Sequence, residues 1–257
     1  GRVNGTFGES SDLVSSLTKS YIKGLQGKKL DNESVASMVK HFPGSGPLDG
    51  GKDSHFPPGI QSYRGDNFQY HIKPFEEAIK IGVSSIMPYY SLPIGITDEE
   101  VAAGYNSELL IDLLRNKYAF DGIICTDWAI ISDIAFPNGQ IVKPASAYGV
   151  ENLNVSQRIK KVIMSGVDLI GGENLTNELV QLIESGQILE SRIDQSVYRI
   201  MKQKFQLGLF DNPYLESDIL KVYDKQYNKE KGIEAQKKSL VLLSNKNNIL
   251  PLSEDSK

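Results

Sequence analysis

The residue best placed to do chemistry in this sequence is Asp127, which ends an apolar run. Ile123, Ile124 and Cys125 are apolar or small, as in a strand buried on both faces, and the first charge follows at the carboxyl end of that run. Barrel enzymes carry their reactive groups at that end of their strands. The pattern predicts a strand that presents Asp127 as a catalytic carboxylate. The alternative is that Asp127 caps the next helix, because Asp is a favoured N-cap residue.

Segments with strand and helix patterns alternate on both sides of this run. We expect helices over 11–23, from Pro74 to about Gly82, after a capping box formed by Thr97 and Glu100, and over 155–165. We expect the other strands over 34–41, 83–89 and 167–170. Such alternation implies an α/β fold with a parallel sheet, whose strands end on one common face.

The strand ends place four positions on that face. They are His41, Tyr90, Asp127 and Gly171. A long loop rich in Gly and Pro, from Phe42 to about Asn67, follows the first of these strands. Loops of this length are usually functional or disordered, and this one contains His55, so we expect a functional loop.

The last part of the sequence has a different pattern. Amphipathic helices are predicted over 177–183 and 191–205, the polar segment 209–232 is typical of a linker, and a final helix should carry Ala235, Leu240 and Leu243. The chain starts without Met, at Gly1, and stops where a new element begins. We therefore expect a piece of a larger polypeptide.

Composition narrows the classes of function. The 257 residues include 28 basic and 32 acidic side chains with a net charge of −4, which disfavours nucleic acid as a partner. No apolar run approaches about 18 residues, so we expect no membrane span. Cys125 is the single cysteine and reads as a core residue. The three histidines form no metal-ligand pattern, and we expect no metal and no cofactor.

Seven motifs occur along the chain in this order: Gly1-Arg2 with Phe7-Gly8-Glu9, Lys40-His41-Phe42-Pro43-Gly44, Ile86-Met87-Pro88-Tyr89-Tyr90, the run Gly122–Trp128, Ser165-Gly166-Val167-Asp168, the run Arg192–Phe210 and Ser239-Leu240-Val241-Leu242-Leu243. Taken together, they resemble glycoside hydrolase family 3, which contains β-glucosidases, β-xylosidases, exo-glucanases and some β-N-acetylglucosaminidases. The resemblance implies the later part of a (β/α)8-type barrel over 1–208, with its N-terminal part missing, a linker over 209–232, and the start of an α/β sandwich domain over 233–257.

The resemblance also implies an activity and a set of site residues. Asp127 matches the nucleophile of a retaining β-glycosidase, which forms a covalent glycosyl-enzyme intermediate during hydrolysis of terminal non-reducing β-D-glucosyl residues. The expected substrate is a β-glucoside or a short β-linked oligosaccharide. The positions that match sugar-binding residues are Arg2, Lys40, His41, Met87, Tyr90 and Trp128. Asp168 begins its strand and is expected to be structural. Family members suggest a periplasmic or secreted location.

The general acid has two interpretations. In two-domain glucosidases it is a Glu of the sandwich domain, which would lie beyond Lys257, and the rest of the polypeptide or another chain would complete the barrel. Alternatively, Asp53 and His55 resemble the acid/base dyad of the β-N-acetylglucosaminidase branch, although Ser45 and the longer loop 46–52 depart from that branch. A third interpretation is a non-catalytic carbohydrate-binding fragment.

Overall fold

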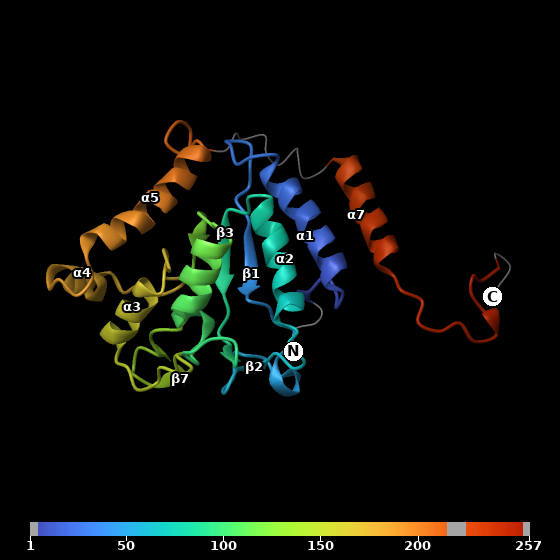
Figure 1. Ribbon diagram of the computed structural model, residues 1–257. Helices are drawn as coiled ribbons and strands as arrows, with labels where there is room; N and C mark the ends of the chain where they lie inside the picture. The colour runs from blue at the N-terminus through green and yellow to red at the C-terminus, as the bar shows by residue number, and fades with distance from the viewer. Residues whose placement is uncertain (1–4, 215–224, 254–257) are drawn as a thin grey trace. The chain divides into compact units, whose positions relative to one another are not determined.

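The computed structural model describes residues 5–214 and 225–253 of the chain, which forms two compact units, Gly1–Asp211 and Asn212–Lys257. The first unit contains the sheet and the candidate site (Figure 1). In the second unit, helix α7 (Gln226–Ser239) and a short turn η6 (Lys246–Asn248) are exposed. The final helix was predicted to reach Leu243 but ends at Ser239, and it begins inside the segment assigned to a linker. The proposed domain limits themselves remain a prediction.

A parallel sheet forms the centre of the first unit. Strands β1 (Met38–Phe42), β3 (Ser85–Pro88) and β5 (Ile123–Ile124) pair in the order β1-β3-β5, with helical segments between them (Figure 1). The predicted α/β fold with a parallel sheet is thereby confirmed. Its closure into a barrel remains a prediction.

The fourth predicted strand, over 167–170, is reduced to a single parallel bridge between Cys125 and Leu169. The backbone N–H of Ile124, which points to this side of the sheet, donates to the carboxylate of Asp168 at 2.9 Å. A side chain therefore occupies a place that a backbone carbonyl would take in a regular ladder. This exchange accounts for the short strand.

Helices surround the sheet. They are α1 (Ser11–Gln26), α2 (Phe68–Lys80), η4 (Glu108–Lys117), α3 (Val155–Met164), α4 (Thr176–Glu184) and α5 (Glu190–Gln206). Helix α1 packs against α2, α2 against β1, and α5 against β5. Smaller elements are η2 (Asp49–Gly51), η3 (Ala103–Tyr105), the parallel pair β2 (Ile60–Ser62) and β4 (Leu92–Ile94), and the hairpin of β6 (Ile134–Ala135) and β7 (Ile141–Lys143).

Helix α2 begins at Phe68, so the prediction that Pro74 opens it was wrong. Pro74 has no N–H to donate to the carbonyl of Tyr70, one turn earlier. That carbonyl accepts the hydroxyl of Ser11 at 2.8 Å, and the Ser11 N–H donates to the Tyr70 hydroxyl at 3.1 Å. The start of α1 thus satisfies the acceptor that proline leaves open inside α2.

The capping box predicted from Thr97 and Glu100 was also wrong. The helix that follows, η4, starts only at Glu108, and the side chain of Asn106 accepts the N–H of Leu109 at 3.0 Å. The carboxylate of Glu108 accepts the backbone N–H groups of residues 98 and 99 at 2.9 and 3.3 Å. Asn106 therefore acts as the cap, and the earlier segment is a loop tied to the first turn of the helix.

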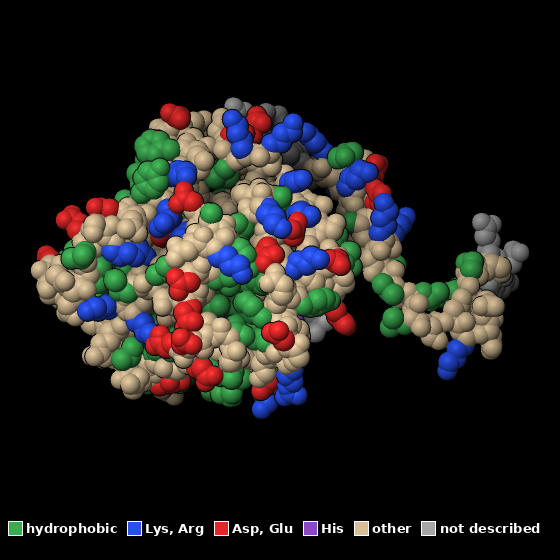
Figure 2. Space-filling model, viewed as in Figure 1, with side chains coloured by type: hydrophobic (Ala, Val, Ile, Leu, Met, Phe, Trp, Pro, Cys, Tyr) green, Lys and Arg blue, Asp and Glu red, His purple; other side chains and the backbone are tan. Residues whose placement is uncertain are grey.

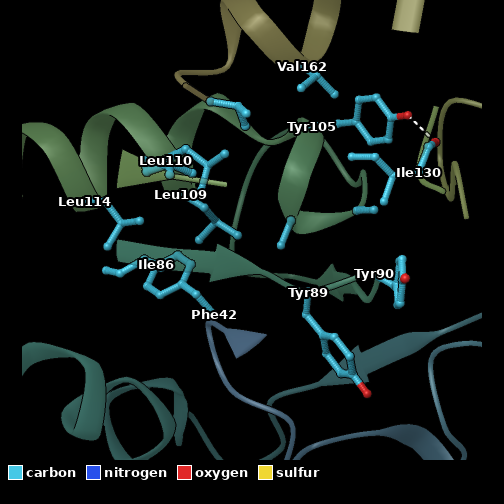
Figure 3. Close-up of a cluster of buried hydrophobic side chains, with 14 of the residues drawn as sticks. Phe42, Ile86, Tyr89, Tyr90, Tyr105, Leu109, Leu110, Leu114, Ile130 and Val162 are labelled. Carbon is cyan, nitrogen blue, oxygen red and sulfur yellow. Dashed lines mark hydrogen bonds between the residues drawn. The ribbon is translucent and has the colours of Figure 1, made fainter. Parts of the chain in front are cut away.

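One part of the hydrophobic core lies between the sheet and η4 (Figure 3). Phe42 and Ile86 from the strands pack with Leu110 and Leu114 from η4, and all four are fully buried. On the outer face shown in Figure 2, Lys and Arg are interspersed with Asp and Glu. Among the described residues, no helix is both long and apolar enough to cross a bilayer.

Asp168 joins three elements of the first unit through one buried carboxylate. Besides the N–H of Ile124, it accepts Arg115 of η4 at 2.5 Å, and Ser196 and Arg199 of α5 at 2.9 and 3.1 Å. Its side chain is 0% exposed. A buried charge of this kind is tolerated only when its hydrogen bonds are made.

We predict that Asp168→Asn lowers the free energy of unfolding by about 3–5 kcal/mol, because the buried guanidinium of Arg115 loses its counter-charge. Denaturant titration followed by circular dichroism measures this. Asp194→Asn, an exposed position on α5, is the matched control and should change stability by less than about 0.5 kcal/mol. Equal stabilities for the two variants would contradict the structural role of Asp168.

Candidate active site

Three neighbouring parallel strands deliver one polar side chain each to the same edge of the sheet. His41 lies in β1, Tyr90 follows β3, and Asp127 follows β5. His41 Nε2 lies 3.3 Å from Asp127 Oδ2. The peptide bonds Lys40–His41 and Phe42–Pro43 are both cis. The edge therefore unites an imidazole, a phenol and a carboxylate in direct proximity.

The carboxylate of Asp127 is nearly enclosed, with 8% of the residue exposed. Its Oδ1 accepts the backbone N–H of Trp128 at 2.8 Å. Its Oδ2 is buried and accepts no hydrogen bond of good geometry from any described residue, although His41 Nε2 lies 3.3 Å away and the Tyr90 hydroxyl is close enough to interact with the carboxylate. Buried polar atoms are almost always hydrogen-bonded, so this oxygen is an exception that calls for a functional reason. No helix starts directly after Asp127, so the alternative that Asp127 is an N-cap residue was wrong.

Tyr90 is buried beside Asp127, and its hydroxyl donates to the carbonyl of Trp128 at 2.6 Å. Burial, together with the negative charge of Asp127, raises the pKa of Tyr90 well above its ordinary value. The phenol consequently keeps its proton at neutral pH and can donate a hydrogen bond. Figure 3 shows Tyr89 and Tyr90 leaving the end of β3 in different directions. Tyr89 stacks on His41 with ring centroids 4.6 Å apart.

Trp128 presents its indole to solvent, with 61% of the residue exposed, while its backbone is fixed at both polar atoms. The indole rests on Gly171 and Gly172, where a Cβ at Gly172 would lie 2.6 Å from the ring atom Cγ. Only glycine allows this approach without displacing the ring. A cavity of about 250 Å³ adjoins the indole, with Asp133 and Asn174 among its lining residues.

The pair Asp53 and His55 is formed and lies beside the site. His55 Nδ1 is 2.6 Å from Asp53 Oδ1, which also accepts the backbone N–H of His55 at 3.0 Å. The imidazole of His55 meets the ring of Tyr90 edge to face, with centroids 4.8 Å apart. The long loop after β1 thus brings a second imidazole and carboxylate next to the residues at the strand ends.

Glu173 is a site residue that the sequence did not reveal. Its two carboxylate oxygens accept the backbone N–H groups of Ile131 and Ser132 at 3.0 and 2.7 Å. These bonds fix the loop that leaves Asp127 and Trp128. The sequence feature that could have indicated this role is the position of Glu173 directly after Gly171-Gly172, at the end of the fourth strand-like segment.

The other predicted positions differ in their surroundings. Met87 is buried within β3, whereas Lys40 is exposed. Arg2 lies outside the described residues.

Burial, with a contribution from the charge of Asp127, raises the pKa of the Cys125 thiol to about 11, so the thiol remains protonated. Among the described ranges, no group of three or more His, Cys, Asp or Glu side chains could hold a metal ion.

The comparison with protein families gives a match over most of the chain. Residues 1–203 match the family described as glycosyl hydrolase family 3 N terminal domain. A probable β-glucosidase C from Aspergillus oryzae is 47% identical over 100% of this chain, and a periplasmic β-glucosidase/β-xylosidase from Dickeya chrysanthemi is 40% identical over 100%. The chain spans 40% and 41% of the lengths of these two relatives.

Among solved structures, a β-glucosidase from Listeria innocua in complex with gluconolactone has a TM-score of 0.83 at 28% identity. The match covers 100% of this chain and 34% of that one. The same enzyme has been solved with glucose and, as an Asp→Ala variant, with laminaribiose.

We predict that Asp127→Asn leaves the free energy of unfolding within about 1 kcal/mol of the original or raises it. The amide oxygen can still accept the N–H of Trp128, and a buried charge with an unsatisfied oxygen disappears. Thermal and denaturant unfolding measure the change. A loss of about 3 kcal/mol or more would show that the carboxylate is structural.

Proposed function

The chain belongs to glycosyl hydrolase family 3, and from this premise we propose that it carries the nucleophile of a retaining β-glucosidase, Asp127. The observation that carries the proposal is the Oδ2 atom of Asp127, which lies beside His41 without a hydrogen bond of its own. A nucleophilic carboxylate must present an oxygen lone pair to the anomeric carbon, and Oδ2 is the oxygen that the Trp128 N–H does not engage. The β-glucosidases among the relatives support glucosides as the substrate class.

In the proposed reaction, Oδ2 of Asp127 forms a bond to the anomeric carbon while the bond from that carbon to the leaving-group oxygen breaks. The leaving oxygen takes a proton from a general acid. A water then attacks the same carbon from the opposite face, gives up a proton to the conjugate base of the general acid, and releases the carboxylate, so two inversions give overall retention. The imidazole of His41 would supply a hydrogen-bond donor beside the carboxylate as charge shifts along this path, while the phenol of Tyr90, which donates its one proton to the Trp128 carbonyl, would hold the backbone around the site.

The sugar would be held by side chains around this carboxylate. We propose Lys40, His41 and Arg2 as donors to the sugar hydroxyls, because fixed donors left unpaired by a wrong epimer discriminate strongly. Met87, Tyr90 and Trp128 would line the pocket. The exposed indole offers an apolar face of the kind on which a sugar ring packs.

The relatives are more than twice as long as this chain, and the proposed whole enzyme has further parts. We propose that residues 1–208 form the later part of a (β/α)8-type barrel, and that residues 209–232 and 233–257 are a linker and the start of a second α/β domain. A carboxyl group outside residues 1–257 would then serve as the general acid.

A second function has one specific observation in its favour. The 2.6 Å contact between Asp53 and His55, beside Tyr90, is the arrangement expected of an acid/base dyad in a β-N-acetylglucosaminidase. The β-glucosidases among the relatives favour the first proposal. In a glucosidase, the same pair would line the sugar pocket.

We predict that a 2-deoxy-2-fluoro-β-D-glucosyl fluoride inactivates the intact protein and leaves one covalent adduct on Asp127. The fluorine at C2 slows both formation and hydrolysis of the intermediate, and the fluoride leaving group speeds formation alone, so the adduct accumulates. Peptide mass spectrometry locates it. Asp127→Ala should lower hydrolysis of aryl β-glucosides by at least about 10³-fold. An adduct on any other residue, with Asp127 unmodified, would refute the nucleophile.

Substitution of His55 separates the two functions. If the dyad is the acid/base pair, His55→Ala should lower activity by about 10²-fold or more, and azide should restore turnover of an aryl glycoside with a good leaving group. If His55 only lines the pocket, azide has no effect. Hydrolysis rates on the N-acetylglucosaminide and the glucoside of the same aryl alcohol identify the preferred sugar.

A further inference from the structure

Lys143, at the end of β7, places its ammonium group next to the candidate site. Its Nζ lies 4.7 Å from the ring centroid of Tyr90, within the range of a cation–π contact. The residue is half-buried. Among residues 5–214 and 225–253, no carboxylate lies within ion-pair distance of this ammonium. A cation so placed keeps its N–H donors available, because the ring face interacts with the charge and accepts no strong hydrogen bond.

The hairpin that carries Lys143 is held firmly to the loop that follows Asp127. The carboxylate of Asp133 accepts the N–H of Ala145 at 2.7 Å, across the two ends of the hairpin. The N–H of Ser146 then donates to the carbonyl of Ala129 at 2.8 Å. With the bonds from Glu173 described above, the base of the hairpin is fixed on both sides. These hydrogen bonds therefore fix the backbone position from which the side chain of Lys143 extends.

The ammonium lies on the solvent side of the site. Ile141 and Val142, its neighbours in β7, are exposed, whereas Tyr90 beneath it is buried with its hydroxyl on the Trp128 carbonyl. In a retaining reaction the leaving group departs on the face of the anomeric carbon opposite the attacking carboxylate. If Asp127 forms the floor, the leaving group points toward the mouth, where Lys143 lies.

We infer that Lys143 is a specificity-determining residue that binds the leaving-group sugar of the substrate. This inference rests on the proposed function. Sugar hydroxyls and ring oxygens accept hydrogen bonds from an ammonium group, while the nitrophenyl group of a synthetic glucoside offers no matching array of hydroxyls. The protein should therefore favour β-glucosides whose leaving group is itself a sugar. Nothing in the sequence pattern around 141–143 indicated this role.

The test compares one disaccharide with one aryl glucoside in the intact protein. Lys143→Met should lower kcat/KM for laminaribiose by about 10-fold to 100-fold, the loss of one charge-assisted hydrogen bond, and change kcat/KM for 4-nitrophenyl β-D-glucoside by less than about 3-fold. Lys143→Arg should retain most of the disaccharide activity. Lys160→Met, an exposed lysine of α3, is the matched control and should leave both values unchanged.

A binding measurement separates this inference from the proposed reaction. In an Asp127→Asn background, calorimetry should show that Lys143→Met weakens laminaribiose at least about 10-fold while glucose binds as before. Selective weakening in this background would uphold the role of Lys143 independently of catalysis, whereas failure of the protein with Asp127 intact to hydrolyse either substrate would refute the hydrolase alone. Equal losses on the disaccharide and the aryl glucoside, or no loss on either, would overturn the inference.

Discussion

Burying the carboxylate of Asp168 removes its hydration, and the donors that compensate for this loss come from three separate elements. Arg115 comes from η4, the N–H of Ile124 from β5, and Ser196 with Arg199 from α5. Because loss of any of these bonds leaves a buried polar or charged group unsatisfied, the three elements have one mutual arrangement. Strand β5, which ends close to the candidate site, is held in place by this arrangement.

Asp127 lies only a few residues beyond Ile124, and its carboxylate has a different hydrogen-bonding environment from that of Asp168. Both carboxylate oxygens of Asp168 accept hydrogen bonds. Asp127 has one buried oxygen without a hydrogen bond of good geometry from the described residues, next to the imidazole of His41. Folding tolerates such a group only where the surrounding structure dictates its position. The satisfied carboxylate thus fixes the strand, and the carboxylate at its end is the proposed nucleophile.

The sequence predicted the parts of the structure that depend on local periodicity. Alternating strands and helices led to the parallel sheet, and the position of each polar residue at a strand end led to their meeting at one edge. Contacts between distant segments were not predictable in this way. Pro74 lies inside a helix because Ser11, far away in the sequence, satisfies the open carbonyl. Glu173 and Lys143 likewise lie near the site because of the paths of the chain between regular elements, and no periodic pattern in the sequence determines those paths.

The central claim is that the free oxygen of Asp127 faces the reacting carbon of a glucoside. A crystal structure of the intact protein with glucose bound tests it most directly. The account predicts the anomeric carbon about 3–3.5 Å from Oδ2 of Asp127, with His41 and Tyr90 around the sugar ring. A glucose bound elsewhere, or one whose anomeric carbon is turned away from that oxygen, would contradict it.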